Sequence, residues 1–152
     1  MCLRKTHPIA KRASKDLYTY KRLNYDMKSP YQWFKYEFGK LYRTKMTSYD
    51  GGGGIDTGFH TLYLPTFRWS NYMKYFDREK SIIVLCKIPK GASYFTGDKS
   101  DIVSSQIIIE KVIFTPKYMN PNQDRKGIKT WESLTRQSYE YLKTNYPNNI
   151  IK

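Results

Sequence analysis

The sequence has few of the residues that build metal centres, disulfide frameworks or membrane spans. Its two histidines, His7 and His60, and its two cysteines, Cys2 and Cys86, are far apart, so no pair has the spacing of zinc ligands. Two cysteines make no disulfide framework, which favours a reducing cytoplasm. No window approaches the ~18 consecutive apolar residues of a membrane-spanning helix. The charged N-terminus is not followed by the apolar segment that a signal peptide requires. We therefore expect no metal, no cofactor and no membrane partner.

Acidic residues are also scarce. The chain has 13 Asp and Glu against 27 Lys and Arg, a formal net charge of +14. Residues 1–46 carry 12 basic and 3 acidic side chains, a net +9, whereas the remainder carries 15 and 10, a net +5. A polyanion relieves such self-repulsion by counterion release, which favours nucleic acid or a ribonucleoprotein complex as partner. The alternatives are an acidic protein partner and a basic face that only contacts solvent.

Aromatic residues are abundant. The chain contains 15 tyrosines. Of its 152 residues, 39% are hydrophobic, which is sufficient for the core of one folded domain. Tyrosine has an apolar body and a polar tip, so it suits partly hydrated surfaces.

The N-terminal third allows two local interpretations. Within residues 9–23, Ile9, Ala13, Leu17 and Tyr20 recur at helical spacing, which predicts a basic amphipathic helix or an arm that orders on binding.

The next segment is ambiguous in the same way. Ser29 and Pro30 resemble a helix start and Gly39 a helix end, which predicts a helix over residues 31–38. The same stretch reads equally as two strand pieces on either side of Gly39, the second reaching Tyr42.

The glycine tract at residues 50–54 predicts a flexible loop. A phosphate-binding loop is the alternative, but the tract lacks the lysine and the Ser or Thr of a P-loop.

The remainder alternates strand and helix signals. Strands are predicted at residues 58–63, 81–88 and 93–96 and in the β-rich stretch 101–114, with a polar loop at 120–126. A short amphipathic helix is predicted at residues 65–76. A C-terminal helix is predicted at residues 131–146, with Trp131, Leu134, Tyr141 and Leu142 facing inward and Pro147 ending it.

These elements predict a single α+β domain. It contains a central, mostly antiparallel sheet, a short inserted helix and a C-terminal helix. The basic arm or helix spans residues 1–28, and the α+β domain spans residues 29–152.

The basic, aromatic-rich N-terminal third is the strongest functional signal. Lysine and arginine side chains neutralise phosphates, and tyrosine or tryptophan faces stack on unpaired bases with about 1–3 kcal/mol each. The predicted nucleic-acid-binding residues are Lys11, Arg12, Lys15, Tyr18, Tyr20, Lys21, Arg22, Lys28, Trp33 and Lys35, with Tyr25 and Tyr31 among them. The alternative is a small apolar cluster covered by lysine stems. No recognised nucleic-acid-binding motif is present.

Two further residues have a possible chemical role. His60 lies in a predicted strand beside Thr61, where it could bind a ribose hydroxyl or act as an acid or base. The alternative is a histidine at the edge of the core. Cys86 is interpreted as a buried strand residue. No other catalytic residue is suggested.

Several short motifs resemble a loose group of small, uncharacterised proteins of tailed phages and mobile elements. They are Tyr36-x-x-Gly39-Lys40-x-Tyr42, Gly58-Phe59-His60, the segment from Cys86 to Gly91, Tyr94-x-x-Gly97 and Ile102-Val103-Ser104. The resemblance covers about residues 31–114. It implies a phage-type protein and brings no activity with it.

The order of elements also resembles the ADP-ribosyltransferase fold. This resemblance implies that Arg43 or His60 would hold the ribose of NAD, with Tyr63 or Tyr72 near the nicotinamide. The family places its catalytic glutamate before the penultimate strand, where this sequence has Ser104-Ser105-Gln106. Glu110 follows several residues later, so the resemblance implies the fold more than the transferase activity.

The leading hypothesis is a small, basic, non-enzymatic phage-type accessory protein. It would bind nucleic acid or a host nucleoprotein complex in the host cytoplasm, as counter-defence proteins do. The alternatives are an ADP-ribosyltransferase-like enzyme that binds NAD, and a structural component of the virion.

Overall fold

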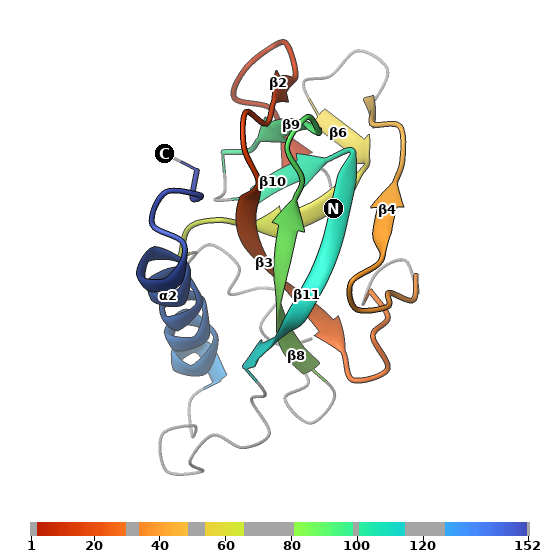
Figure 1. Ribbon diagram of the computed structural model, residues 1–152. Coiled ribbons are helices and arrows are strands. Elements are labelled where there is room, and N and C mark those ends of the chain that lie inside the picture. Colours follow the sequence, from red (N-terminus) through yellow and green to blue (C-terminus); the bar gives the residue numbers. More distant parts are fainter. Residues whose placement is uncertain are drawn as a thin grey trace.

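An eight-stranded antiparallel sheet forms most of the protein, and one helix packs against it (Figure 1). The computed structural model describes residues 3–29, 34–48, 54–65, 81–98, 101–114 and 127–151. The strand order is β2-β9-β10-β7-β3-β8-β11-β4, so β2 and β4 are the edge strands. These strands are β2 (Lys11–Arg12), β3 (Leu17–Asn24), β4 (Leu41–Arg43), β7 (Phe59–Leu62), β8 (Ser81–Ile88), β9 (Ser93–Thr96), β10 (Asp101–Ser104) and β11 (Gln106–Phe114).

A second, three-stranded sheet has the order β1-β6-β5. It consists of β1 (Leu3–Arg4), β5 (Thr47–Ser48) and β6 (Gly54–Thr57). β5 follows β4 and β6 precedes β7, so this sheet is connected to two strands of the larger one.

The centre of the large sheet is the pair β3 and β8. They are antiparallel along eight residues, from Leu17 opposite Ile88 to Asn24 opposite Ser81. Nearly every side chain of β8 is buried, because its apolar run contacts other parts of the protein on both faces of the sheet. β11 pairs with the other side of β8 and contains two irregularities in its register, at Ile109/Lys111 and Val112/Phe114.

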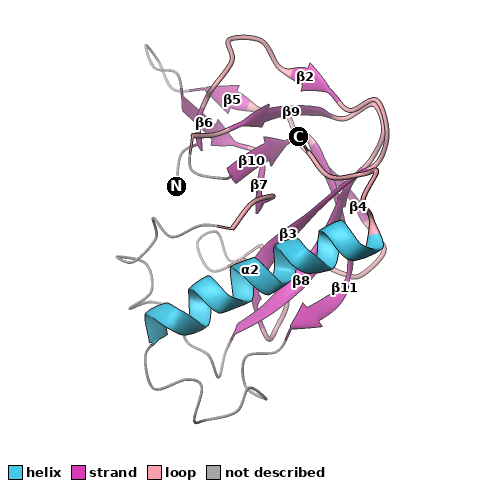
Figure 2. Cartoon of the chain, turned by 90° about the vertical axis from the view of Figure 1, so that its left-hand side faces the viewer, coloured by secondary structure: helices cyan, strands magenta, loops and turns pink. Residues whose placement is uncertain are grey.

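The two faces of the sheet have separate apolar cores. On one face, Leu23, Val84 and Ile109 form a cluster with Tyr36 and Phe59. On the other, Tyr20, Ile83 and Leu85 pack with Leu142 of α2 (Gly127–Asn145). Figure 2 shows α2 lying across β3, β8 and β11.

The chain after α2 returns to the start of β3. Tyr146 stacks on Tyr18 with ring centroids 3.9 Å apart. The backbone N–H of Tyr18 donates to the Asn149 carbonyl at 3.0 Å, and the Asn149 amide donates to the Asp16 carbonyl at 2.7 Å. These bonds satisfy backbone groups of Asp16 and Tyr18 at the start of β3, where the strand is not paired with β7.

The predicted fold class is confirmed, as are the strands at residues 58–63, 81–88, 93–96 and 101–114. The C-terminal helix is also confirmed, although it begins at Gly127 rather than at residue 131. It ends at Asn145, two residues before Pro147, in agreement with the restriction that proline places on the preceding residue.

The prediction of a helix or arm at residues 9–23 is wrong, because this segment contains β2 and most of β3. Leu17, Tyr20 and Leu23 recur every three residues, which mimics a helical stripe. In the structure all three are buried because β3 is covered on both faces: Tyr20 packs towards α2, whereas Leu23 packs on the opposite face.

The alternatives for residues 31–42 are partly decided. Residues 34–38 form no helix, and the chain turns at Gly39, whose φ is 75°, before entering β4. The strand interpretation is therefore right for the piece after Gly39. Several predicted segments lie wholly or almost wholly outside the described residues. They are the helix at residues 65–76, the loop at 120–126, residues 31–33 and most of the glycine tract.

Candidate nucleic-acid interface

The sheet divides the predicted binding residues into buried and exposed groups. Tyr20 is fully buried, and its hydroxyl donates to the Leu64 carbonyl at 2.8 Å. Burial raises the pKa of Tyr20 far above its ordinary value. Tyr18 stacks on Tyr146, and partial burial raises its pKa too. Tyr20 offers no ring face to a base, so its assignment to the interface is wrong. Tyr18 is half-buried and has one ring face against Tyr146, so its contact with a base stays a prediction.

Lys21 is also directed into the protein. Its ammonium group donates to the backbone carbonyl of His60 at 2.6 Å. Burial lowers the pKa of Lys21, while the nearby Cys86 thiol partly opposes that shift. Arg22, the next residue of β3, is half-buried. The prediction that Lys21 contacts phosphate is therefore wrong, because its ammonium already holds an internal acceptor.

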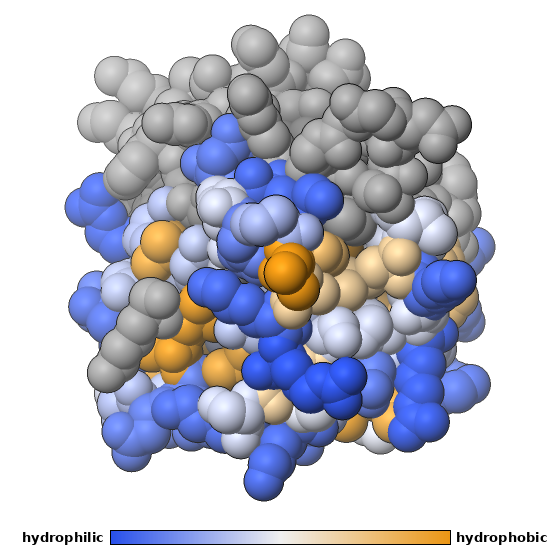
Figure 3. Space-filling model, turned by 90° about the horizontal axis from the view of Figure 1, so that it is seen from above, coloured by the Kyte–Doolittle hydropathy of each residue, from blue (hydrophilic) through white to orange (hydrophobic). Residues whose placement is uncertain are grey.

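Three predicted cations form a β2 surface, which we define as Lys11, Arg12 and Lys15. All three are exposed, and β2 is held at the sheet edge by pairing with Tyr94 and Ser93 of β9. Viewed from this end of the molecule, hydrophilic residues surround small hydrophobic groups (Figure 3). β2 itself contains no aromatic residue, and Tyr94, opposite Lys11, is half-buried.

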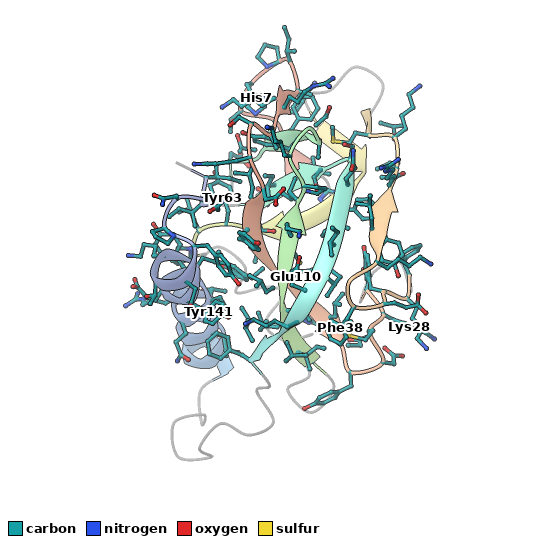
Figure 4. All side chains as sticks on the ribbon, in the orientation of Figure 1. His7, Lys28, Phe38, Tyr63, Glu110 and Tyr141 are labelled. Carbon is teal, nitrogen blue, oxygen red and sulfur yellow. The ribbon has the colours of Figure 1, made fainter. Side chains whose placement is uncertain are left out.

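The other predicted cations border the opposite edge of the sheet. Lys28 and Lys35 face each other in an antiparallel bridge. Backbone bonds from Ser29 to the Phe34 carbonyl and from Tyr36 to the Met27 carbonyl, 2.8 and 2.9 Å long, fix this arrangement. Figure 4 shows Lys28 and Phe38 on the side of β11 that faces away from α2.

Aromatic rings are anchored beside these cations. Tyr36 is buried in the core and makes edge-to-face contacts with Phe34 and Tyr42, with ring centroids 4.9 and 5.2 Å apart. Phe34 and Tyr42 contact each other at 5.4 Å. Phe34 and Phe38 nevertheless remain 43% and 50% exposed. The cluster thus holds the exposed ring of Phe34 against the buried Tyr36.

We define the β4 surface as Phe34 and Phe38 with the cations around them and along the β4 edge, Lys28, Lys35, Lys40, Arg43 and Lys45. Tyr42 and Arg43 point to opposite faces of β4. Lys40 lies over the Tyr42 ring, so Lys40 and Arg43 flank different sides of this edge.

The β4 surface has an excess of positive charge. Residues 24–29 and 34–48 contain five basic and two acidic side chains, a net +3. The acidic groups form exposed pairs, Asp26 with Lys28 at 3.9 Å and Glu37 with Lys40 at 3.6 Å, which contribute little stability. Within the described part of the chain, Lys35, Arg43 and Lys45 have no ion-pair partner.

The sequence pattern selected Lys28 and Lys35 of the β4 surface as nucleic-acid contacts and did not select Arg43, Lys45, Phe34, Phe38 and Lys40. The run Phe34 to Lys40 alternates rings with charges, which is a signal that could have identified the two phenylalanines and Lys40. Trp33, also selected from the sequence, lies outside the described residues.

The residues implied by the ADP-ribosyltransferase resemblance are dispersed. Arg43 lies on β4, whereas His60 lies on β7, and β3, β8 and β11 separate these strands. Tyr63 is half-buried against a cluster that contains Leu17 and Ile102, and burial raises its pKa. The strand order therefore does not bring Arg43 together with His60. Tyr72 lies outside the described residues.

Cys86 is a buried strand residue, as its sequence context predicted. Burial raises the pKa of its thiol to about 12, and the Lys21 ammonium opposes this shift only partly. The thiolate, which is the reactive form, is therefore scarce at neutral pH. The arrangement around Cys86 does not favour nucleophilic chemistry.

No described cluster of His, Cys, Asp and Glu has the composition and spacing to hold a metal ion. The described helix is not apolar enough to cross a membrane. Comparisons with protein-family models, curated proteins and solved structures find no match to this chain.

Proposed function

We propose that this protein is a small basic accessory protein that binds nucleic acid, free or in a nucleoprotein complex, through the β4 surface and without catalysing a reaction. The resemblance of residues 31–114 to small phage proteins supports a role in an infected host cell, of the counter-defence type.

The observation that carries this proposal is the pairing of Lys28 with Lys35. Like charges directly opposite each other on neighbouring strands are destabilising, and of these two lysines only Lys28 has an acidic neighbour among the described residues, Asp26 at 3.9 Å. A phosphate group between the two ammonium groups would relieve the repulsion. The positive charge of the β4 edge would then be used for binding rather than for folding.

Counterion release gives this interface a defined salt dependence. Each neutralised phosphate of a single strand contributes about −0.7 to the slope of log affinity against log salt concentration, so five cations give at most about −3.5. An acidic protein partner lacks the condensed counterions of a nucleic acid. The slope therefore distinguishes these partners.

Two matched variants test the surface. Lys35→Gln/Lys40→Gln/Arg43→Gln removes two lysines and one arginine from the β4 surface, and Lys11→Gln/Arg12→Gln/Lys15→Gln removes the same set from the β2 surface. Affinity for a fluorescent oligonucleotide is measured between about 50 and 200 mM salt. We expect the first variant to bind more weakly, with a slope reduced by about 2, and the second to remain close to the unmodified protein. Absence of oligonucleotide binding, or an equal or larger loss in the β2 variant, would overturn the proposal.

A further inference from the structure

The phenyl rings of the β4 surface indicate which form of nucleic acid fits it. We propose that this surface binds single-stranded nucleic acid, with unpaired bases stacked on Phe34 and Phe38 and phosphates held by the adjacent cations. The inference rests on the proposed function, because it presupposes that the β4 surface is the binding surface.

These two residues are the most exposed phenylalanines in the described chain. Phe59 and Phe95 are at most 9% exposed, and Phe114 is half-buried. Phenylalanine has no polar group that benefits from contact with water, so two exposed rings four residues apart make this part of the surface a candidate for interaction. Their position among lysines favours a partner that has both flat apolar faces and negative charge.

Backbone contacts fix the positions of both residues, and ring contacts also fix the side chain of Phe34. Phe34 is fixed by the hydrogen bond from Ser29 to its carbonyl and by its ring contacts with Tyr36 and Tyr42. Phe38 pairs with Ile109, and the N–H of the following Gly39 donates to the Ile109 carbonyl at 2.8 Å. A pre-organised surface loses little conformational freedom on binding.

A duplex does not match this arrangement. Its bases stack on one another, so it presents phosphates and groove edges but few accessible base faces. A single strand presents both its phosphates and its bases, and every base has a face on which an aromatic ring can stack. The interleaving of Phe34, Lys35, Phe38 and Lys40 therefore complements a single strand, with little selectivity for its sequence.

A peptide strand added to the edge of β4 is the competing occupant. β4 contributes only three residues, which gives such a strand few backbone hydrogen bonds. It would also leave the exposed phenyl rings without a specific role. The surface therefore favours a nucleic acid over a β-strand.

The test compares an oligothymidine single strand with a duplex of the same length, using fluorescence anisotropy and the full-length protein. In Phe34→Leu/Phe38→Leu, the apolar character is retained and the rings are lost. The matched control is Tyr139→Leu, which removes a partly exposed ring that also has a lysine over it, Lys143 at 4.8 Å. Thermal unfolding verifies that each variant is folded.

We expect the double variant to lose about tenfold or more in affinity for the single strand, with duplex affinity and the Tyr139→Leu control unchanged. Phe34→Trp/Phe38→Trp should bind the single strand more tightly, because tryptophan offers a larger stacking face, and impaired folding cannot produce that gain. Salt-dependent binding that prefers the duplex, or that is indifferent to the loss of both rings, would overturn this inference and leave the proposed function intact. Binding of neither oligonucleotide would overturn both.

Discussion

The ammonium group of Lys21 donates a hydrogen bond to the backbone carbonyl of His60 at 2.6 Å, which joins β3 to β7. Both residues stood out in the sequence as separate functional candidates, Lys21 for phosphate and His60 for a ribose or for proton transfer. The ladder between these strands includes only the pair of Tyr20 and Leu62, so the Lys21 bond reinforces a short connection in the sheet. Its role is structural.

Replacing Lys21 should change how stability depends on pH. Burial lowers the pKa of Lys21 below its ordinary value of 10.5. The unfolded chain keeps the ordinary pKa of lysine, whereas the folded protein has the lowered one. Between these two values the unfolded chain binds more protons than the folded protein, so the free energy of unfolding rises with pH, by at most about 1.4 kcal/mol per pH unit. Lys21→Met should lack this rise. Urea denaturation at several pH values below 10.5 measures it, and identical pH slopes for the two proteins would contradict the prediction.

Gly58 should not tolerate a side chain. A Cβ atom there would clash with Val103 Cγ2, and the φ of 151° is unfavourable for other residues. We expect Gly58→Ala to lower the free energy of unfolding by about 2–4 kcal/mol. The control is Gly91→Ala, where φ is 92° and no atom lies within 4 Å, so only the backbone cost of about 1–2 kcal/mol applies. Equal losses in urea denaturation would show that the contact with Val103 relaxes without cost.

Tyr20→Phe should destabilise the protein through one hydrogen bond. The variant retains the buried ring and removes the donor to the Leu64 carbonyl, which is 2.8 Å away. We expect a loss of about 1 kcal/mol in the free energy of unfolding. Tyr18→Phe is the comparison, because it retains the stacking on Tyr146, and it should change stability by less than about 0.5 kcal/mol. A fully stable Tyr20→Phe protein would mean that Leu64 finds another donor.

Cys86 should be protected in the native protein. Cys2→Ser leaves Cys86 as the only cysteine. Because burial raises the pKa of the Cys86 thiol to about 12, we expect no reaction with a chromogenic disulfide reagent at neutral pH and complete reaction in denaturant. Rapid modification of the folded variant would disprove the burial of this thiol.

The sequence by itself determined the elements whose signals are local. The apolar run of β8 has the length and composition of a strand buried on both faces. The apolar positions Leu134 and Leu142, followed by Pro147, suffice to predict a C-terminal helix and its end. The excess of basic residues in the N-terminal third likewise follows directly from the sequence.

Tertiary structure decided which of those basic residues are exposed and which are directed into the protein. The spacing of Leu17, Tyr20 and Leu23 fits a helix as well as a strand buried on both faces, and only pairing with β8, more than fifty residues away, selects the strand. That choice directs Lys21 into the sheet. The bridge between Lys28 and Lys35 and the ring contacts of Phe34 likewise depend on partners that no local pattern specifies. Contacts between distant residues therefore separate the structural lysine of β3 from the exposed cations of the β4 surface.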